Sequence, residues 1–211
     1  MEQNQKIAII GGTGKVGKHI AKIAVEHGYN VRLLIRNPEK VTFRDDRIEI
    51  VQGDAKDNAA IKALLEGCQI VINTFGQPVK AEQLYSRVTE QILSVMNEFG
   101  ISRYIGVTGG SLTVAGDQKS IINKLGAKLF EVLFSKMMID KKKELHALEK
   151  SKVEWTLVRL PFVVEGMEKG IIKENLFDMP GSTITNTDIA RFLIRQIDDK
   201  KYLRKIPFIA G

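Results

Sequence analysis

The sequence contains a single cysteine, Cys68, among its 211 residues, so no disulfide can form within the chain. This scarcity is typical of a reducing compartment, and we expect a cytoplasmic location. Cys68 stands just before an apolar run, which favours a structural role over a nucleophilic one. No apolar stretch approaches the roughly 18 residues of a membrane-spanning helix, and the polar first residues do not resemble a signal peptide. We therefore expect no membrane association.

The chain also lacks a concentrated block of one charge. It is basic overall, with a formal net charge of +7 and a pI of about 9.4, but its basic residues are spread along the chain and alternate with acidic ones. Aromatic residues make up only 7% of the chain and are not interleaved with the basic residues. This pattern argues against nucleic-acid binding and favours a solvated basic surface that attracts anionic ligands. The length suits one domain, residues 1–211, and we predict no metal site.

Residues 6–17 carry the most informative pattern. Residues 7–10 form a short apolar run with three isoleucines, which predicts a strand buried on both faces. Helically spaced apolar residues follow and stop at Gly28. A strand, a glycine turn and a helix together predict a dinucleotide-binding unit, whose helix N-terminus receives the phosphates. The predicted cradle consists of Gly11, Gly12, Thr13, Gly14, Lys15, Val16 and Gly17.

Two alternatives remain for this stretch. Its glycines have the spacing G-x-x-G-x-x-G rather than the more common G-x-G-x-x-G, so it could be a turn that binds nothing. Residues 12–18 also match the phosphate-binding pattern G-x-x-x-x-G-K, but His19 stands where that loop needs a magnesium-binding hydroxyl.

A basic residue ends the second predicted strand, residues 30–36. An acidic side chain at this position would bind the 2′-hydroxyl of NAD, whereas the sequence has Arg36, with Lys40 nearby and Lys15 in the glycine loop. Because a guanidinium binds a phosphate through two hydrogen bonds, we expect NADP in preference to NAD. Arg36 could instead be a simple exposed cation.

The remaining pattern alternates strands with helices. We predict strands at residues 47–51, 69–73, 103–107, 154–160 and 205–209, and helices at 59–65, 82–99, 120–150 and 187–196. This alternation predicts an α/β fold with a doubly wound parallel sheet, helices on both faces and a small C-terminal elaboration on the substrate side. Pro207 suggests an edge position for the last strand. Asp54 is a candidate cap for the helix near Lys56, and Thr187 caps the last one.

For two helical segments the sequence does not decide between core, surface and interface. Tyr85 is expected at the surface or in an interface. The apolar residues 121–139 predict a core helix, or in part the wall or lid of a substrate pocket, because Met137 and Met138 suit an adaptable apolar surface. Residues 83–99 and 121–139 also leave room for a homodimer.

Several motifs now stand in the order found in one family. They are the glycine loop, Arg36, Asp54 and the segments 108–112, 155–161 and 187–190. Together they resemble the atypical short-chain dehydrogenases/reductases, and most closely the NAD(P)H-binding proteins of the NmrA-like and biliverdin/flavin reductase-like type. The resemblance covers nearly the whole chain and implies a Rossmann fold with NADP(H) stretched across the carboxyl edge of the sheet.

The resemblance also implies roles for single residues. The glycine loop would bind the pyrophosphate and Arg36 the 2′-phosphate, and Asp54 with Ala55 would flank the adenine. Residues 112–135 and 162–185 would form the substrate wall. The ribose and nicotinamide would be lined by Thr74, Phe75, Gly76, Thr108 and Gly109, with Pro161 and Phe162 closing on the nicotinamide.

One part of the family pattern is missing. Active members carry Tyr-x-x-x-Lys on the helix before the sixth strand, where the tyrosine acts as acid and base, but no tyrosine precedes residues 141–143 by four positions. Lys142 is the middle candidate for holding the ribose hydroxyls. Ser111 is a weak candidate proton donor and His146 another. A reductase that takes its proton from water would need none of them.

These observations favour an NADPH-dependent oxidoreductase that transfers hydride to a small apolar or conjugated substrate. The missing tyrosine motivates an alternative, a non-catalytic NADP(H) sensor that acts through a protein partner. An isomerase or epimerase with a retained cofactor is a third possibility.

Overall fold

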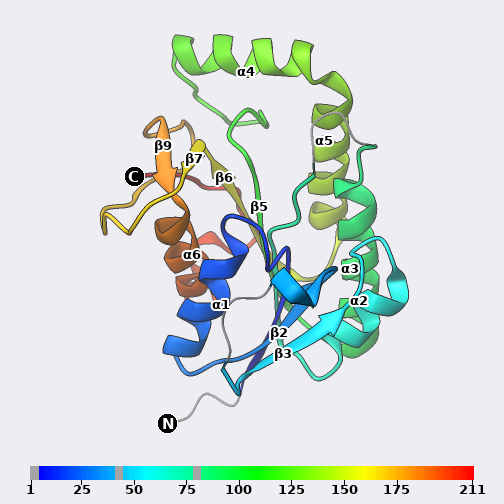
Figure 1. Ribbon diagram of the computed structural model, residues 1–211. Helices are drawn as coiled ribbons and strands as arrows, with labels where there is room; N and C mark the ends of the chain where they lie inside the picture. The colour runs from blue at the N-terminus through cyan, green and yellow to red at the C-terminus, as the bar shows by residue number, and fades with distance from the viewer. Residues whose placement is uncertain (1–4, 41–44, 78–81) are drawn as a thin grey trace.

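The fold is organised around one large sheet. A computed structural model describes residues 5–40, 45–77 and 82–211. The sheet has the order β3-β2-β1-β4-β5-β6-β10-β8 (Figure 1). Its strands are β3 (Ile48–Gln52), β2 (Asn30–Ile35), β1 (Lys6–Ile10), β4 (Ile70–Asn73), β5 (Arg103–Gly109), β6 (Glu154–Leu160), β10 (Phe208–Ala210) and β8 (Lys173–Asn175). Every pairing is parallel except that of β8 with β10, which confirms the predicted doubly wound sheet.

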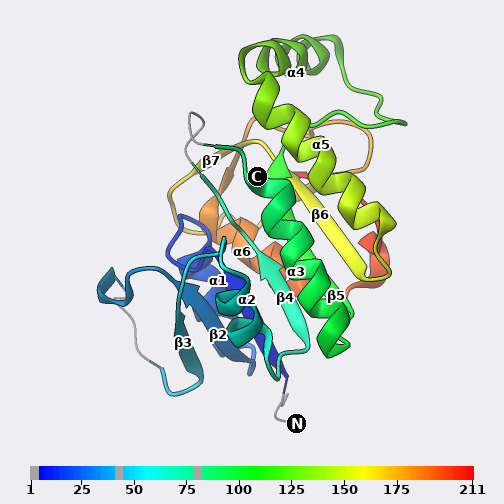
Figure 2. The same cartoon turned by 90° about the vertical axis from the view of Figure 1, so that its right-hand side faces the viewer.

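Helices cover both faces of this sheet. The helices are α1 (Gly17–Glu26), α2 (Asn58–Leu65), α3 (Tyr85–Phe99), α4 (Ile121–Leu133), α5 (Ser135–Lys150) and α6 (Asn186–Arg195), of which α4 lies apart from the sheet. Short 3-10 turns occupy Pro38–Lys40 and Lys200–Tyr202, and β7 (Phe162–Val164) pairs with β9 (Thr183–Thr185) in a separate ribbon. Helices α1 and α6 lie on one face and α2, α3 and α5 on the other (Figures 1 and 2).

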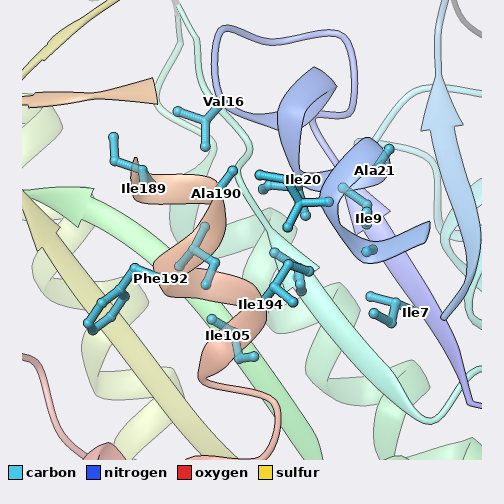
Figure 3. Packing of buried hydrophobic residues seen from close by; sticks show 14 of the residues in the cluster. Ile7, Ile9, Val16, Ile20, Ala21, Ile105, Ile189, Ala190, Phe192 and Ile194 are labelled. Carbon is cyan, nitrogen blue, oxygen red and sulfur yellow. The ribbon is translucent and has the colours of Figure 1, made fainter. Parts of the chain in front are cut away.

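The two faces are held by separate apolar clusters. On one side, Ile7 and Ile9 of β1 meet Ile20 of α1 and Ile189 and Phe192 of α6 (Figure 3). On the other side, the alternate β1 residues Ala8 and Ile10 pack with α2, α3 and α5. Because β1 is buried on both faces, its sequence is apolar at nearly every position rather than alternating.

The strand order identifies one point on the carboxyl edge of the sheet as the expected ligand-binding position. β1 pairs with β2 on one side and with β4 on the other, so the chain reverses direction of winding between β1 and β4. In open α/β sheets, ligands bind outside the carboxyl ends of the strands at such a reversal. Among the described residues, no helix is long and apolar enough to cross a bilayer.

The structure corrects the expected positions of the last strand and of Tyr85. The last strand lies between β6 and β8 rather than at an edge, and Pro207 precedes it, so no ladder hydrogen bond is lost. The segment 120–150 is mainly helical as predicted, and it forms two helices, α4 and α5, which change direction at Phe134. Tyr85 is 9% exposed, because the N-terminus of α3 is covered by α5.

The expected helix caps also shift by a few residues. Asp57, not Asp54, caps α2 by accepting a hydrogen bond from the Ala59 backbone N–H. Thr185, not Thr187, caps α6 through the Asp188 backbone N–H. In both cases the helix begins one residue earlier than its apolar periodicity suggested.

Candidate functional site

The glycine loop between β1 and α1 is closed by backbone contact. Gly11 has a φ of +82°, and a Cβ there would lie 2.6 Å from the carbonyl oxygen of Thr74. A Cβ on Gly17 would lie 2.1 Å from the carbonyl oxygen of Gly11. The Gly14 backbone N–H donates to that same oxygen at 2.8 Å. The first and third glycines are therefore required for the loop to close, which gives the G-x-x-G-x-x-G spacing a steric cause.

The helix that follows this loop offers an anion-binding end. Val16, at the N-cap of α1, makes no side-chain cap, and the first turn carries no acidic residue. Thr13, Gly14 and Lys15 are exposed above it. Uncapped N–H groups and the helix dipole favour negative charge at this point. The loop can therefore hold a phosphate group, which agrees with the predicted cradle.

A side chain from α6 fixes this loop in place. Asn186 is 2% exposed, and its amide nitrogen donates to the carbonyl oxygen of Lys15 at 3.1 Å. The same nitrogen lies 3.0 Å from Nε2 of His19, and its carbonyl oxygen accepts from the Gly166 backbone N–H. Burial, with help from Lys18, lowers the pKa of His19. Sequence reasoning missed Asn186, because it stands 171 residues from Lys15 along the chain.

A cavity of about 450 Å³ extends from the glycine loop along the carboxyl edge of the sheet. Arg36 and Asp54 lie at the ends of β2 and β3 and line it. Arg36 is exposed and makes no ion pair with any described residue, while the side chain of Lys40 falls outside the described part. Twelve predicted cofactor residues line this cavity: Gly11, Thr13, Gly14, Lys15, Val16, Gly17, Arg36, Asp54, Ala55, Thr74, Phe75 and Gly76.

The β4 end of the cavity is held by a buried polar network. The Thr74 hydroxyl donates to the carbonyl oxygen of Ile10 at 3.0 Å, which ties the turn after β4 to β1. The Asn73 side chain donates to the Tyr104 hydroxyl at 2.9 Å and accepts from the Phe75 backbone N–H. These bonds fix the residues expected to line the ribose and nicotinamide.

A second cavity, also of about 450 Å³, adjoins the first across the end of β5. Val107 lines the first cavity and Gly109 the second, with Thr108 between them. The chain after β6 divides them in the same way, because Val163 lines the first cavity and Pro161 and Phe162 the second. The walls of the second cavity are mostly apolar: Ile122, Gly126, Ala127 and Phe130 of α4, with Leu160 and Met179.

A buried lysine stands behind the boundary of the two cavities. Lys141 is 8% exposed, and its Nζ donates to the Thr108 hydroxyl at 3.3 Å. The same Nζ lies 3.8 Å from the centre of the Tyr85 ring, a cation–π contact. Burial lowers the pKa of Lys141, and the nearby Glu144 and Asp140 oppose that shift.

Lys142, the lysine predicted to hold the ribose hydroxyls, is one residue away from the lysine that faces β5. Lys142 is on the outer side of α5, where its ammonium group pairs with Glu131 at 2.5 Å and half of its side chain is exposed. Since neighbouring residues on a helix point about 100° apart, only one of the three lysines can face β5. His146 is also exposed, beside Glu149. Ser111 lines the second cavity, with its hydroxyl 3.7 Å from the sulfur of Met138.

Acidic groups surround the buried lysine. Glu144 is 3% exposed and accepts from the Thr89 hydroxyl at 3.1 Å, and burial raises its pKa. Asp140 accepts from the backbone N–H groups of Tyr85 and Ser86 and so caps α3 from a neighbouring helix. The helix α3 has no side-chain cap of its own. Lys141 is thus held by a framework that joins α3, α5 and β5.

A buried ion cluster anchors the loop that forms the floor of the second cavity. Arg159 is fully buried in β6, where its guanidinium donates to both oxygens of Asp117 at 2.8 Å and lies 3.4 Å from the Phe208 ring. Lys119 donates to the carbonyl oxygens of Gly110 and Leu112. Burial lowers the pKa of Lys119 against the effect of Asp117. Sequence reasoning missed this cluster, because an arginine inside an apolar strand was the only signal.

Gly12 and Cys68 have structural positions in this arrangement. Gly12 is buried under Leu33 and supports the loop without lining the cavity. Cys68 is buried, and burial raises the pKa of its thiol to about 11, the opposite of nucleophilic activation. Among the described residues, no cluster of His, Cys, Asp or Glu could hold a metal ion.

Comparisons with known proteins agree with this geometry. The family model described as NAD(P)H-binding matches residues 11–200. A short-chain dehydrogenase/reductase from Veillonella parvula, solved in complex with NADP, superposes with a TM-score of 0.79 at 15% identity, covering 98% of this chain and 94% of that one. At this identity the likeness shows a shared fold.

Curated relatives include plant reductases. Phenylcoumaran benzylic ether reductase IRL1 of Ginkgo biloba is 31% identical over 116 residues, 50% of this chain and 36% of that protein. Probable pinoresinol-lariciresinol reductase 3 of Arabidopsis thaliana is 22% identical over an alignment covering 100% of this chain and 70% of that protein. The match therefore spans about a third of the Ginkgo protein's length. The family model covers most of the chain and the fold agrees with it, so the chain belongs to the NAD(P)H-binding family.

Proposed function

We propose that this protein is an NADPH-dependent reductase of a small apolar or conjugated substrate. The observation that carries the proposal is the pair of adjoining cavities, one with an anion-binding glycine loop and one with apolar walls, separated by Val107–Gly109. NADP would suit the first cavity, because no side chain at Gly17 closes the cradle and because Arg36, which makes no ion pair with any described residue, would bind a 2′-phosphate. The cofactor would supply a hydride across the boundary.

The chain's own residues would orient the reactants and supply polar groups. The glycine loop and α1 would hold the pyrophosphate, and Asp54 with Ala55 would flank the adenine. The apolar wall of α4 would exclude water from the second cavity and select an apolar substrate. Gly109 lines this cavity, and Pro161 and Phe162 would close it over the nicotinamide.

Lys141, rather than Lys142, is our candidate for the ribose and the proton. Its Nζ contacts the Thr108 hydroxyl between the two cavities, and the lowered pKa means that it releases a proton more readily than a solvated lysine. Tyr85 would shield Lys141 with its ring. Its hydroxyl is hydrogen-bonded to the backbone of Gln77, and burial raises its pKa. Ser111 remains a second candidate donor at the substrate side.

A screen of NADPH oxidation with quinones, flavins, tetrapyrroles and aryl ethers tests the proposal. We expect turnover with at least one class, and Lys141→Met should lower kcat by about 100-fold or more while dinucleotide affinity falls less. Lys143→Met, on the exposed part of the same helix, is the control and should keep wild-type kcat. Tight NADPH binding without turnover of any acceptor would favour the sensor and contradict the reductase.

A further inference from the structure

The outer face of α4 is an unusual surface. Only Ala127 of this helix is buried, and the core role predicted for the apolar residues 121–139 is wrong for most of α4. The helix lies across one end of the molecule, away from the sheet (Figure 1). Six large apolar side chains, 61–82% exposed, form what we call the α4 seam: Ile121, Ile122, Leu125, Leu129, Val132 and Leu133.

The spacing of the α4 seam is that of a helix pair. Ile122, Leu125, Leu129 and Val132 follow one another at intervals of three, four and three residues, which is the a/d pattern of a two-helix contact. Ile121 and Leu133 flank this row on the adjacent positions. A helix that packs only against its own domain does not need such a row on its solvent side.

The α4 seam is also symmetric along the helix. Leu125 and Leu129 stand two residues either side of position 127, Ile122 and Val132 five residues, and Ile121 and Leu133 six residues. In an antiparallel pair of identical helices related by a two-fold axis at this level, each residue would face its counterpart from the other copy. A two-fold contact needs this self-complementarity, because the same patch must serve both partners.

The size of the seam suits such a contact. At this exposure each of the six residues presents on the order of 100 Å² to solvent, so the seam exposes roughly 600 Å², the upper end of what single chains usually leave uncovered. Two copies would bury about 1,200 Å² together, the lower end of specific interfaces.

The charges on α4 argue against a lipid surface as the occupant. Membrane-surface helices have a polar face rich in lysine and arginine and carry aromatic residues on the apolar side. The polar positions of α4 are mixed, with Lys124 and Lys128 beside Asn123 and Glu131. Glu131 already pairs with Lys142, and no seam residue is aromatic.

We propose that the α4 seam binds the α4 seam of a second copy of this chain, antiparallel and about a two-fold axis at the level of position 127. Ile122, at the border of the seam, also lines the second cavity together with Gly126, Ala127 and Phe130 of the inner side, so the dimer contact would brace that wall in both copies. The α3 helix, the other segment with room for a dimer, contributes only Phe99 as an exposed large apolar residue.

Sedimentation analysis of the full chain between about 1 and 100 µM tests the proposal. We expect wild type to approach twice the 23.6 kDa chain mass. Leu125→Glu with Leu129→Glu places like charges opposite each other and should give a monomer. Leu125→Glu with Leu129→Lys places opposite charges across the axis and should restore the dimer, at least tenfold tighter than the double-glutamate variant. Ile139→Glu, 55% exposed on α5 outside the seam, should leave the dimer intact.

Several results would overturn the proposal. A wild-type monomer at 100 µM would do so whether or not any variant folds. So would a double-glutamate variant that stays dimeric, or a glutamate–lysine variant that is no tighter than the double-glutamate one. Wild type that stays monomeric and floats with vesicles of phosphatidylglycerol and phosphatidylcholine, while the double-glutamate variant does not, would assign the seam to a membrane surface instead.

Discussion

Replacing Gly17 by alanine tests whether the glycine loop can close with a side chain at this position. The new Cβ would lie 2.1 Å from the Gly11 carbonyl oxygen, and an ordinary contact needs at least 3.4 Å, so the loop must open by more than 1 Å. Overpacking of this kind costs about 1–3 kcal/mol. The better helix propensity of alanine returns at most about 1 kcal/mol. We expect a net loss of up to about 3 kcal/mol in the free energy of unfolding, together with at least a tenfold loss of NADPH affinity.

Gly126→Ala is the matched control, because it makes the same substitution inside α4, where a new Cβ would meet nothing within 4 Å. Urea denaturation should show Gly126→Ala unchanged or up to about 1 kcal/mol more stable. The two variants should therefore differ by about 1–3 kcal/mol, which is the overlap cost alone. If Gly17→Ala proves as stable as Gly126→Ala and binds NADPH like wild type, the steric reasoning about the glycine loop is refuted.

Three further substitutions test the site and its framework. Arg36→Glu should weaken NADPH binding, measured by calorimetry, by roughly 10- to 150-fold and leave NADH binding unchanged, because a hydrogen bond to a charged group contributes about 1.5–3 kcal/mol. The control with an equal change of charge is Lys152→Glu, which replaces an exposed cation just before β6. Asp117→Asn should lower the free energy of unfolding, measured by urea denaturation, by about 3–5 kcal/mol, because it leaves Arg159 buried without its charged partner. Glu98→Gln, which removes the exposed ion pair with Lys62, should change it by no more than about 1 kcal/mol. Equal losses would contradict the burial argument. Burial raises the pKa of Glu144 above its ordinary 4.5, so just above that pH the folded chain holds more protons than the unfolded chain and stability falls as pH rises. Urea denaturation across this pH interval should show that Glu144→Gln lacks this fall. Parallel curves of unfolding free energy against pH for wild type and variant would contradict the prediction.

The sequence predicts the fold well because its signals are local. The apolar run of β1, the glycines after it and the helical spacing of α1 lie within about 20 residues of one another, and the structure keeps that order. The alternation of strands and helices then leaves few ways to wind a parallel sheet. Gly17 is identifiable for the same reason, since the contact with Gly11 that excludes a side chain is made within the loop itself, whereas the contact that excludes a side chain at Gly11 comes from the distant Thr74.

The residues that the sequence misplaced depend on contacts between distant segments. The orientation of α5 decides which of its lysines faces β5. Periodicity alone leaves an uncertainty of one residue, so the sequence predicts Lys142 where the structure has Lys141. The sequence predicts Tyr85 at the surface or in an interface, because no local signal shows that Asp140 of α5 hydrogen-bonds to the start of α3 and that α5 covers it. The apolar residues of α4 look like core from composition, and only the packing shows that most of them face outward.

Calorimetric titration of the purified chain with NADPH, NADH, NADP and NAD is the most direct test of the central claim. We predict that NADPH and NADP bind, and that each binds at least tenfold more tightly than its unphosphorylated counterpart, because Arg36 would bind the 2′-phosphate at the end of β2. Saturation with NADPH at 100 times its dissociation constant should also raise the free energy of unfolding by about 2.7 kcal/mol. Absence of binding by all four dinucleotides would contradict the account, and equal affinity for NADPH and NADH would remove the role given to Arg36.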